Sequence, residues 1–146
     1  AYNSRLDTLQ AIVANHLLPQ LGEITEGRQR NAASLDRRLR EIAEIELPPP
    51  PDDRTHVYHL YSFKAQNRSE LLPFLLEKGI DAKVHYPVPM HLQPASAEYG
   101  YKRGDFPIAE ALCESVVSLP VHQFMQESDL DTMAGALKEF YARKVR

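Results

Sequence analysis

Four consecutive prolines, residues 48–51, divide the chain into two unlike parts. Proline has no backbone N–H and its ring fixes φ, so neither a helix nor a central strand continues through such a run. Helical patterns precede the prolines, whereas short strand-like and helix-like segments follow them. We therefore predict a helical segment over residues 1–45 and a small α+β domain over residues 46–146.

Apolar residues before the prolines recur at intervals of three and four, which is the spacing of one helix face. The first helix is expected to stop near Pro19, and a second to resume at about Leu21. The small sheet predicted downstream is not large enough to cover both stripes, so the sequence indicates a missing partner. That partner is either the rest of a longer polypeptide or a second subunit. The stripe residues are Leu6, Leu9, Ile12, Val13 and Leu17, then Leu21, Ile24, Ala32, Leu35, Leu39 and Ile42.

The part after the prolines is predicted to form two or three strands with helices on one face. Strands are expected at 56–64, which is rich in valine and tyrosine and reads as a central strand, and at 80–86. Helices are expected to begin at Asn67, near Pro107 and at about Ser128. The residues expected to be buried in the helix after Pro107 are Ala109, Leu112, Cys113 and Val116.

Composition argues against several kinds of protein. Seventeen basic residues are balanced by twenty acidic ones, and no long basic run is present, so nucleic acid is not an expected partner. No apolar stretch approaches the roughly 20 residues that cross a bilayer, so no membrane association is expected. The single cysteine, Cys113, excludes an internal disulfide framework and favours a cytoplasmic location.

Residues 83–94 form the most distinctive stretch of the sequence. His85, Tyr86, His91 and Gln93 lie in a loop that several prolines stiffen. Rigidly held loops are where binding groups are usually placed. The alternative interpretation is a structural turn whose polar residues are simply on the surface.

The histidines also raise the possibility of a metal-dependent hydrolase, alongside the pair His56 and His59. A separation of three residues puts that pair on opposite faces of a strand. No cysteine or carboxylate near His85 and His91 completes a tetrahedral set of ligands. We therefore predict no metal site.

Two further segments have both an ordinary and a functional interpretation. Asn3 opens the first helix, where it either caps the helix or donates a hydrogen bond to a phosphate at the helix N-terminus. Residues 100–107 place two glycines around two cations, which is typical of a plain loop before a helix. The residues alone do not separate these interpretations.

Four segments together resemble the signatures of one family. YNSRLDTLQA at 2–11, HYPVPMHLQPA at 85–95, GYKRGDFPIAE at 100–110 and SLPVH at 118–122 are similar to motifs of the DegT/DnrJ/StrS sugar aminotransferases. They occur in that family's order and with its spacing. The resemblance covers nearly the whole chain.

The resemblance implies an enzyme that uses pyridoxal 5'-phosphate to move an amino group onto a keto-sugar. The sugar is usually nucleotide-linked, and glutamate is the common donor. It also implies the C-terminal small domain of the aspartate-aminotransferase-like fold, with residues 1–45 joining the large and small domains, and a homodimer whose sites lie at the subunit interface. Asn3 would contact the cofactor phosphate, and His85 and Tyr86 would contact the sugar nucleotide. Arg5 and Asp7 would instead fix the start of the first helix.

The chain departs from the family in one respect. The family's Schiff-base lysine, its pyridinium-pairing aspartate and its ring-stacking aromatic residue lie upstream of the first motif. None of the chain's own lysines matches a family position, so no catalytic residue is predicted here. We expect the chain alone not to catalyse transamination. The alternative is a non-catalytic binding or regulatory module derived from the family.

Overall fold

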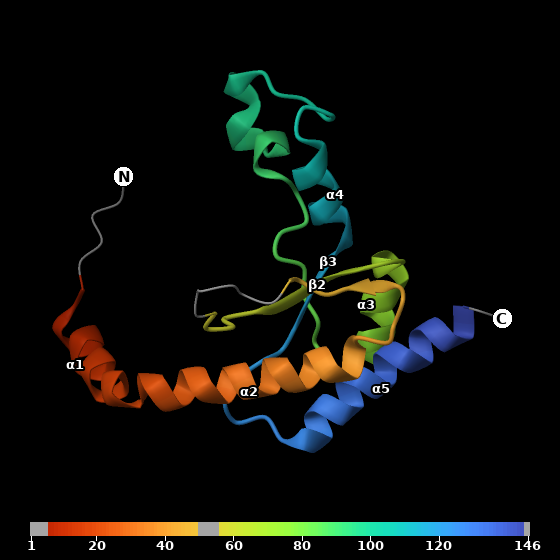
Figure 1. Cartoon of the computed structure of the whole chain (residues 1–146). Helices are drawn as coiled ribbons and strands as arrows, with labels where there is room; N and C mark the ends of the chain where they lie inside the picture. Colours follow the sequence, from red (N-terminus) through yellow and green to blue (C-terminus); the bar gives the residue numbers. More distant parts are fainter. Residues whose placement is uncertain (1–5, 50–55, 145–146) are drawn as a thin grey trace.

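The computed structural model describes residues 6–49 and 56–144. Two helices joined by a short turn precede the sheet, and Figure 1 shows α1 set at an angle to α2: α1 (Thr8–Leu17), η1 (Leu18–Gln20) and α2 (Leu21–Leu39). The sheet is antiparallel, in the order β1 (Ile45–Glu46), β2 (Tyr61–Ala65) and β3 (Val116–Leu119). The remaining elements are α3 (Arg68–Glu77), η2 (Met90–Leu92), η3 (Pro94–Tyr99), α4 (Pro107–Ser115) and α5 (Glu127–Lys144).

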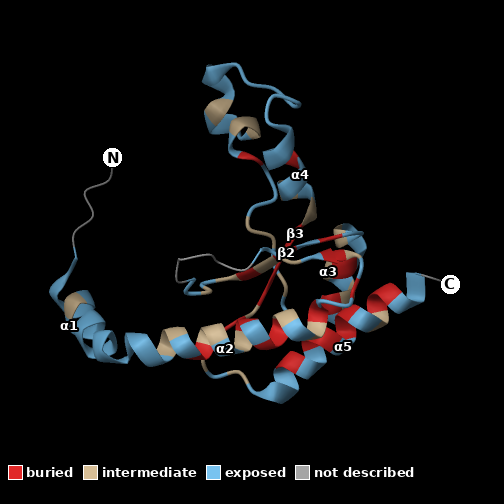
Figure 2. Ribbon diagram, in the orientation of Figure 1, coloured by how far each residue is buried: buried red, intermediate tan, exposed pale blue. Residues whose placement is uncertain are grey.

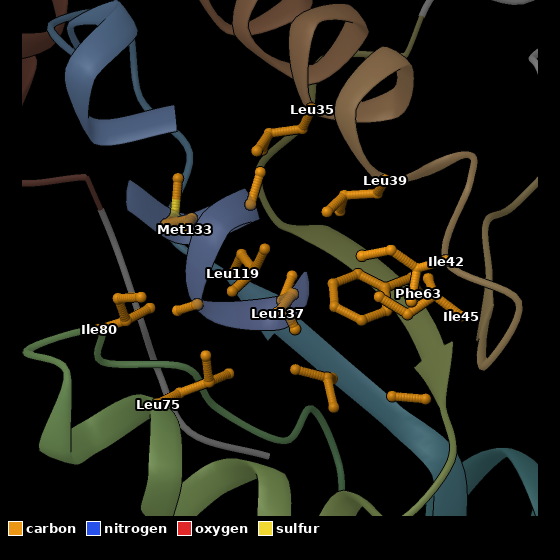
Figure 3. Close-up of a cluster of buried hydrophobic side chains, with 14 of the residues drawn as sticks. Leu35, Leu39, Ile42, Ile45, Phe63, Leu75, Ile80, Leu119, Met133 and Leu137 are labelled. Atoms are coloured by element: carbon orange, nitrogen blue, oxygen red, sulfur yellow. The ribbon is translucent and has the colours of Figure 1, made fainter. Parts of the chain in front are cut away.

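One face of the sheet carries the core. Tyr61 and Phe63 alternate with more exposed residues along β2, because successive side chains of a strand point to opposite faces. The register pairs them with Leu119 and Val117 of β3. Figures 2 and 3 show α2, α3 and α5 covering this face. These helices contribute Leu35 and Leu39, Leu71 and Leu75, and Leu130, Met133 and Leu137. The predicted α+β class is therefore confirmed.

The other face of the sheet bears a projecting segment, residues 84–115, which we call the arm. Lys83 and Ser118 close its base, with hydrogen bonds of 2.9 and 2.8 Å in the two directions between their backbones. Figure 1 shows the arm, with α4 in it, standing away from the helices of the core. The core cluster draws no residue from the arm. The arm is thus anchored by the sheet and is not part of the core.

α1 lies outside the core as well. Its start is fixed by Asp7, whose carboxylate accepts a 2.9 Å hydrogen bond from Leu9 N, while Asp7 N donates a 3.1 Å hydrogen bond to Gln10 Oε1. This reciprocal capping satisfies two of the backbone donors that a helix end leaves free. α1 has no buried residue, and Leu9 remains 74% exposed. The predicted apolar stripe therefore lies uncovered in the part of the chain that the structure describes.

The two predicted strands differ from the observed ones. β2 begins only at Tyr61, because Tyr58 has a left-handed φ of 46° and donates its backbone N–H to His56 Nδ1. A residue in that conformation interrupts a strand. The strand expected at 80–86 reduces to one bridge at Lys83, since the chain turns into the arm directly afterwards.

The apolar stripe predicted for α4 is buried only at its end. Ala109 and Leu112 are exposed and Cys113 is half-buried, because this face of α4 borders a cavity instead of the core. Val116 is buried, but it belongs to β3, a strand that helical periodicity did not predict. The domain division at 45/46 stays a prediction, although α2 already contributes Leu35 to the core.

No helix among residues 6–49 and 56–144 is both long enough and apolar enough to span a bilayer.

Candidate functional site

The arm and the start of β3 enclose a cavity of about 440 Å³. One wall is the segment from His85 to Gln93, and the other is α4 with Phe106 before it. The lining is mostly apolar, which suits a site that binds by shape with a few polar contacts. The lining residues are His85, Tyr86, Val88, Pro89, Met90, His91, Gln93, Phe106, Ala109, Leu112, Cys113 and Val116.

His85 and Tyr86, the predicted substrate residues, both border this cavity. The Nδ1 atom of His85 is buried and has no hydrogen-bond partner among the described residues. Buried polar atoms are normally paired, so this nitrogen is a free polar group beside the cavity. Tyr86 is 71% exposed, and its ring meets that of His85 edge-on at 5.7 Å. The peptide bond between the two residues is cis.

Two further hollows continue the cavity on either side of these residues. One runs from Tyr86 to Ala95 along the proline-rich loop. The other runs from His85 over Ser62 and Lys64, on the face of the sheet opposite the core. Together the hollows give an extended surface along the base of the arm with His85 and Tyr86 at its centre.

Glu110 joins the two walls of the cavity. Its Oε1 atom lies 2.9 Å from His91 Nε2 and accepts a 2.8 Å hydrogen bond from Gly104 N. Phe106 N donates to the same oxygen at 3.4 Å. The hydrogen bond from the Gly104 backbone, reinforced by His91, holds the pKa of Glu110 below its usual value. The carboxylate is therefore ionised at neutral pH.

Three aromatic rings pack together beside this carboxylate. The rings of His91 and Phe106 are 4.7 Å apart, and Tyr101 meets Phe106 edge-on at 5.1 Å. The loop between them turns at Gly104, whose φ of 99° is a conformation that favours glycine. The segment 100–107 is thus a tight turn that brings Phe106 to the cavity.

Arg68 holds α4 from outside the arm. Its Nη1 group, on α3, donates to the carbonyl oxygens of Cys113 and Val116. These carbonyls lie where α4 passes into β3, and the last carbonyls of a helix lack partners inside the helix. Arg68 therefore fixes the end of α4 against the main body.

Sequence reasoning did not single out Glu110, Phe106 or Arg68. Two signals were available for Glu110: it is a charged residue inside the apolar pattern of residues 106–116, and it ends the motif at 100–110. Arg68 had none, because its contacts join residues 45 and 48 positions apart. Asn3, the predicted phosphate contact, lies outside the described residues.

Metal binding and covalent cofactor attachment each require particular side chains. No group of three or more His, Cys, Asp or Glu within 6–49 and 56–144 is arranged to hold a metal ion. The lining of the cavity contains neither lysine nor arginine. A Schiff base requires a lysine amine, and a phosphate favours cationic donors or a helix N-terminus. The described lining of the cavity therefore offers no lysine amine for a Schiff base.

Comparison with known proteins identifies the family. The model of the DegT/DnrJ/EryC1/StrS aminotransferase family matches residues 1–138. The chain belongs to this family. It is 40% identical over 142 residues to a "Pleiotropic regulatory protein" of Geobacillus stearothermophilus, covering 96% of this chain and 38% of that protein. It is 35% identical over 141 residues to dTDP-3-amino-3,4,6-trideoxy-alpha-D-glucose transaminase of Streptomyces venezuelae, covering 97% and 37%.

Solved structures of family members have the same fold. DesV of S. venezuelae, in complex with a ketimine intermediate, superposes with a TM-score of 0.90 at 34% identity, over 96% of this chain and 38% of that one. A family member from Brucella abortus gives 0.87 at 33% identity, over 96% and 37%. The resemblance predicted from the four motifs is confirmed, as is its fold. The chain corresponds to the C-terminal part of such proteins and spans little more than a third of their length.

Proposed function

We propose that this chain forms the C-terminal part of a pyridoxal-phosphate-dependent aminotransferase acting on a nucleotide-linked keto-sugar. The family match over residues 1–138 carries this proposal. Related proteins are named as aminotransferases of sugars linked to two different nucleotides, dTDP and UDP. Glutamate, the family's common donor, is the proposed source of the amino group.

In this proposal His85 and Tyr86 bind the sugar nucleotide. The imidazole of His85, which borders the cavity, supplies a hydrogen bond to a hydroxyl or phosphate oxygen. The exposed ring of Tyr86 supplies a flat surface and a hydroxyl. The apolar cavity between them and α4 accommodates the less polar parts of the ligand.

The cofactor belongs to another part of the assembly. Pyridoxal phosphate, when bound, withdraws electrons from the carbon that exchanges the amino group. We propose that Asn3 reaches its phosphate in a homodimer, and that the lysine which carries it lies outside this chain's cavity. The cavity residues of this chain bind and orient the sugar, so the chain alone is inactive.

The test uses the full-length protein encoded by the natural reading frame. It is incubated with pyridoxal phosphate, glutamate and keto-sugar nucleotides, and aminated sugar is measured by mass spectrometry. Tyr86→Ala and His85→Ala should each raise KM by about tenfold, as expected for the loss of substrate binding contacts. Tyr99→Ala is the matched control, because Tyr99 is an exposed arm tyrosine (66%) outside the cavity lining.

Two results would count against the proposal. One is the absence of amination with every keto-sugar nucleotide, despite bound cofactor. The other is a borohydride-stabilised cofactor adduct on a lysine of this chain when it is assayed alone.

A regulatory role is the second candidate, favoured by the 40% identity to the Geobacillus protein named as a pleiotropic regulator. In that case the full-length protein would bind neither pyridoxal phosphate nor a sugar nucleotide. Cofactor absorbance of the purified protein separates the two roles.

A further inference from the structure

Glu110 is the most enclosed carboxylate in the described part of the arm. Its side chain is 10% exposed, and that of its partner His91 is 8% exposed. A buried charge is costly unless it is paired and hydrogen-bonded. Here His91, Gly104 N and Phe106 N all satisfy it. The carboxylate in turn fixes the positions of these three partners.

Helix capping explains only part of this network. Glu110 lies in the first turn of α4, and its contacts with Phe106 N and Gly104 N satisfy backbone donors around the helix start. His91 needs no such cap, because it lies on η2 in the opposite wall. The Glu110–His91 contact is therefore not part of helix capping. It fixes one wall of the cavity against the other.

The contact also orients two side chains that line the cavity, those of His91 and Phe106. Nε2 of His91 donates to Glu110, and the His91 ring packs at a tilt against that of Phe106. Both His91 and Phe106 line the cavity that His85 and Tyr86 border. Release of His91 would let the loop that carries Met90 and Gln93 move away from α4. The spacing of the walls thus depends on one carboxylate.

We propose that Glu110 is a positioning residue for sugar-nucleotide binding, acting through His91 and Phe106 to hold the two walls of the cavity at a fixed separation. This proposal rests on the proposed function for its ligand. The proposal concerns a residue that does not contact the ligand. Its effect on the separation of the cavity walls can be measured without an activity assay.

The experiment compares two substitutions on the same helix in the full-length protein. Glu110→Gln removes the charge and replaces one acceptor oxygen with an NH2 group. The neighbours of the carboxylate are N–H groups, so the new NH2 group faces other donors and not an acceptor. Glu114→Gln is the control, because Glu114 lies one turn further along, is 69% exposed and pairs with the exposed Arg103. KM for the sugar nucleotide and kcat are measured for each. The rate at which iodoacetamide alkylates Cys113, which lines the cavity, is followed by peptide mass mapping.

Glu110→Gln should raise KM about tenfold while kcat stays within about twofold, because a charge-assisted hydrogen bond is lost and binding, not chemistry, is weakened. Cys113 should be alkylated several-fold faster. Glu114→Gln should leave both quantities unchanged.

A second pair of variants distinguishes a specific effect on the cavity from a general folding defect. His91→Gln keeps an N–H donor near the position of Nε2 and should bind substrate and protect Cys113 almost as the wild type does. His91→Ala should behave like Glu110→Gln. Rescue by the conservative variant is not expected of a residue that matters only for bulk stability.

The proposal is overturned if Glu110→Gln leaves KM and Cys113 alkylation unchanged, or if His91→Ala and His91→Gln are equally impaired. An inactive wild-type protein would defeat the proposed function. Alkylation of Cys113 would then still decide whether Glu110 holds the walls together.

Discussion

Gly27 illustrates how a single position can decide the packing of a helix. It lies on α2 where that helix crosses the chain leaving β3. A Cβ placed on Gly27 would lie 2.7 Å from Gln123 Cβ and 3.1 Å from Gln123 Cα. Next to it, Arg28 Nη1 donates to the carbonyl oxygens of Tyr58 and Val121, at 2.9 and 3.0 Å. The absence of a side chain at Gly27 allows this close approach.

Gly27→Ala should therefore destabilise the protein by about 1–3 kcal/mol, the usual cost of overpacking, even though alanine favours helix by about 1 kcal/mol. Gly22→Ala, earlier in the same helix, has nothing within 4 Å of the added Cβ. It should stabilise by up to about 1 kcal/mol. Urea unfolding midpoints measure both. Equal shifts of the same sign in the two variants would contradict the packing argument.

Residues that work through neighbours in sequence were easier to predict than those that work through distant contacts. His85 and Tyr86 stand out because the prolines around them mark a rigid loop, and the structure does bring both to one cavity. Their role as substrate ligands, like that of Asn3, stays a prediction. Glu110 and Arg68 were not predicted because their partners are set by the fold.

At the scale of elements, α4 depends on a contact from outside itself. It has nine residues and buries only Glu110, so packing contributes little to hold it. Arg68, on α3, donates to carbonyl oxygens at its C-terminal end. A short helix without a buried stripe relies on such end contacts.

Arg68→Met should loosen α4 and destabilise the protein by about 1.5–3 kcal/mol, the range for a hydrogen bond to a charged group. Alkylation of Cys113 should become faster, because α4 forms that wall of the cavity. Arg103→Met is the control, since Arg103 makes only an exposed ion pair with Glu114, worth less than about 1 kcal/mol. If both variants alkylate at the wild-type rate, the end contact is not what holds α4.

The errors at this scale lie in the short strands and in the buried face expected of α4. β1 has two residues and β3 four, and strands of that length depend on their partners more than on intrinsic preference. Val116 and Val117 continue the apolar period of α4, so the sequence pattern alone extends the helix through them. The long, regular segments α2 and α5 were predicted near their observed bounds because their periodicity persists over several turns.

At the scale of the whole molecule, α1 and the arm are two parts that the core does not stabilise. α1 is ten residues long and buries none of them, and isolated helices shorter than about 12–15 residues are marginal in water. The superposition with DesV includes 96% of this chain but only 38% of that enzyme. The longer proteins therefore contain enough additional chain to cover the α1 stripe.

Amide hydrogen exchange should show the difference. In the 146-residue chain alone, residues 8–17 should exchange with little protection, because no tertiary contact resists local opening. In the full-length protein the same amides should be protected by about tenfold or more, as burial of several leucine-sized groups implies. α5, which buries seven residues, is the internal control and should be protected in both. Strong protection of α1 in the isolated chain would refute this.

The base of the arm has a consequence for how such proteins diversify. Ser118 pairs through its backbone with Lys83, where the arm begins, and with Ser62 of β2. Backbone pairing makes few demands on side-chain identity, and no arm residue belongs to the core cluster. Selection can thus exchange residues between 84 and 115 without repacking the interior. Under the proposed function, the fold separates the evolution of ligand preference from the maintenance of the core.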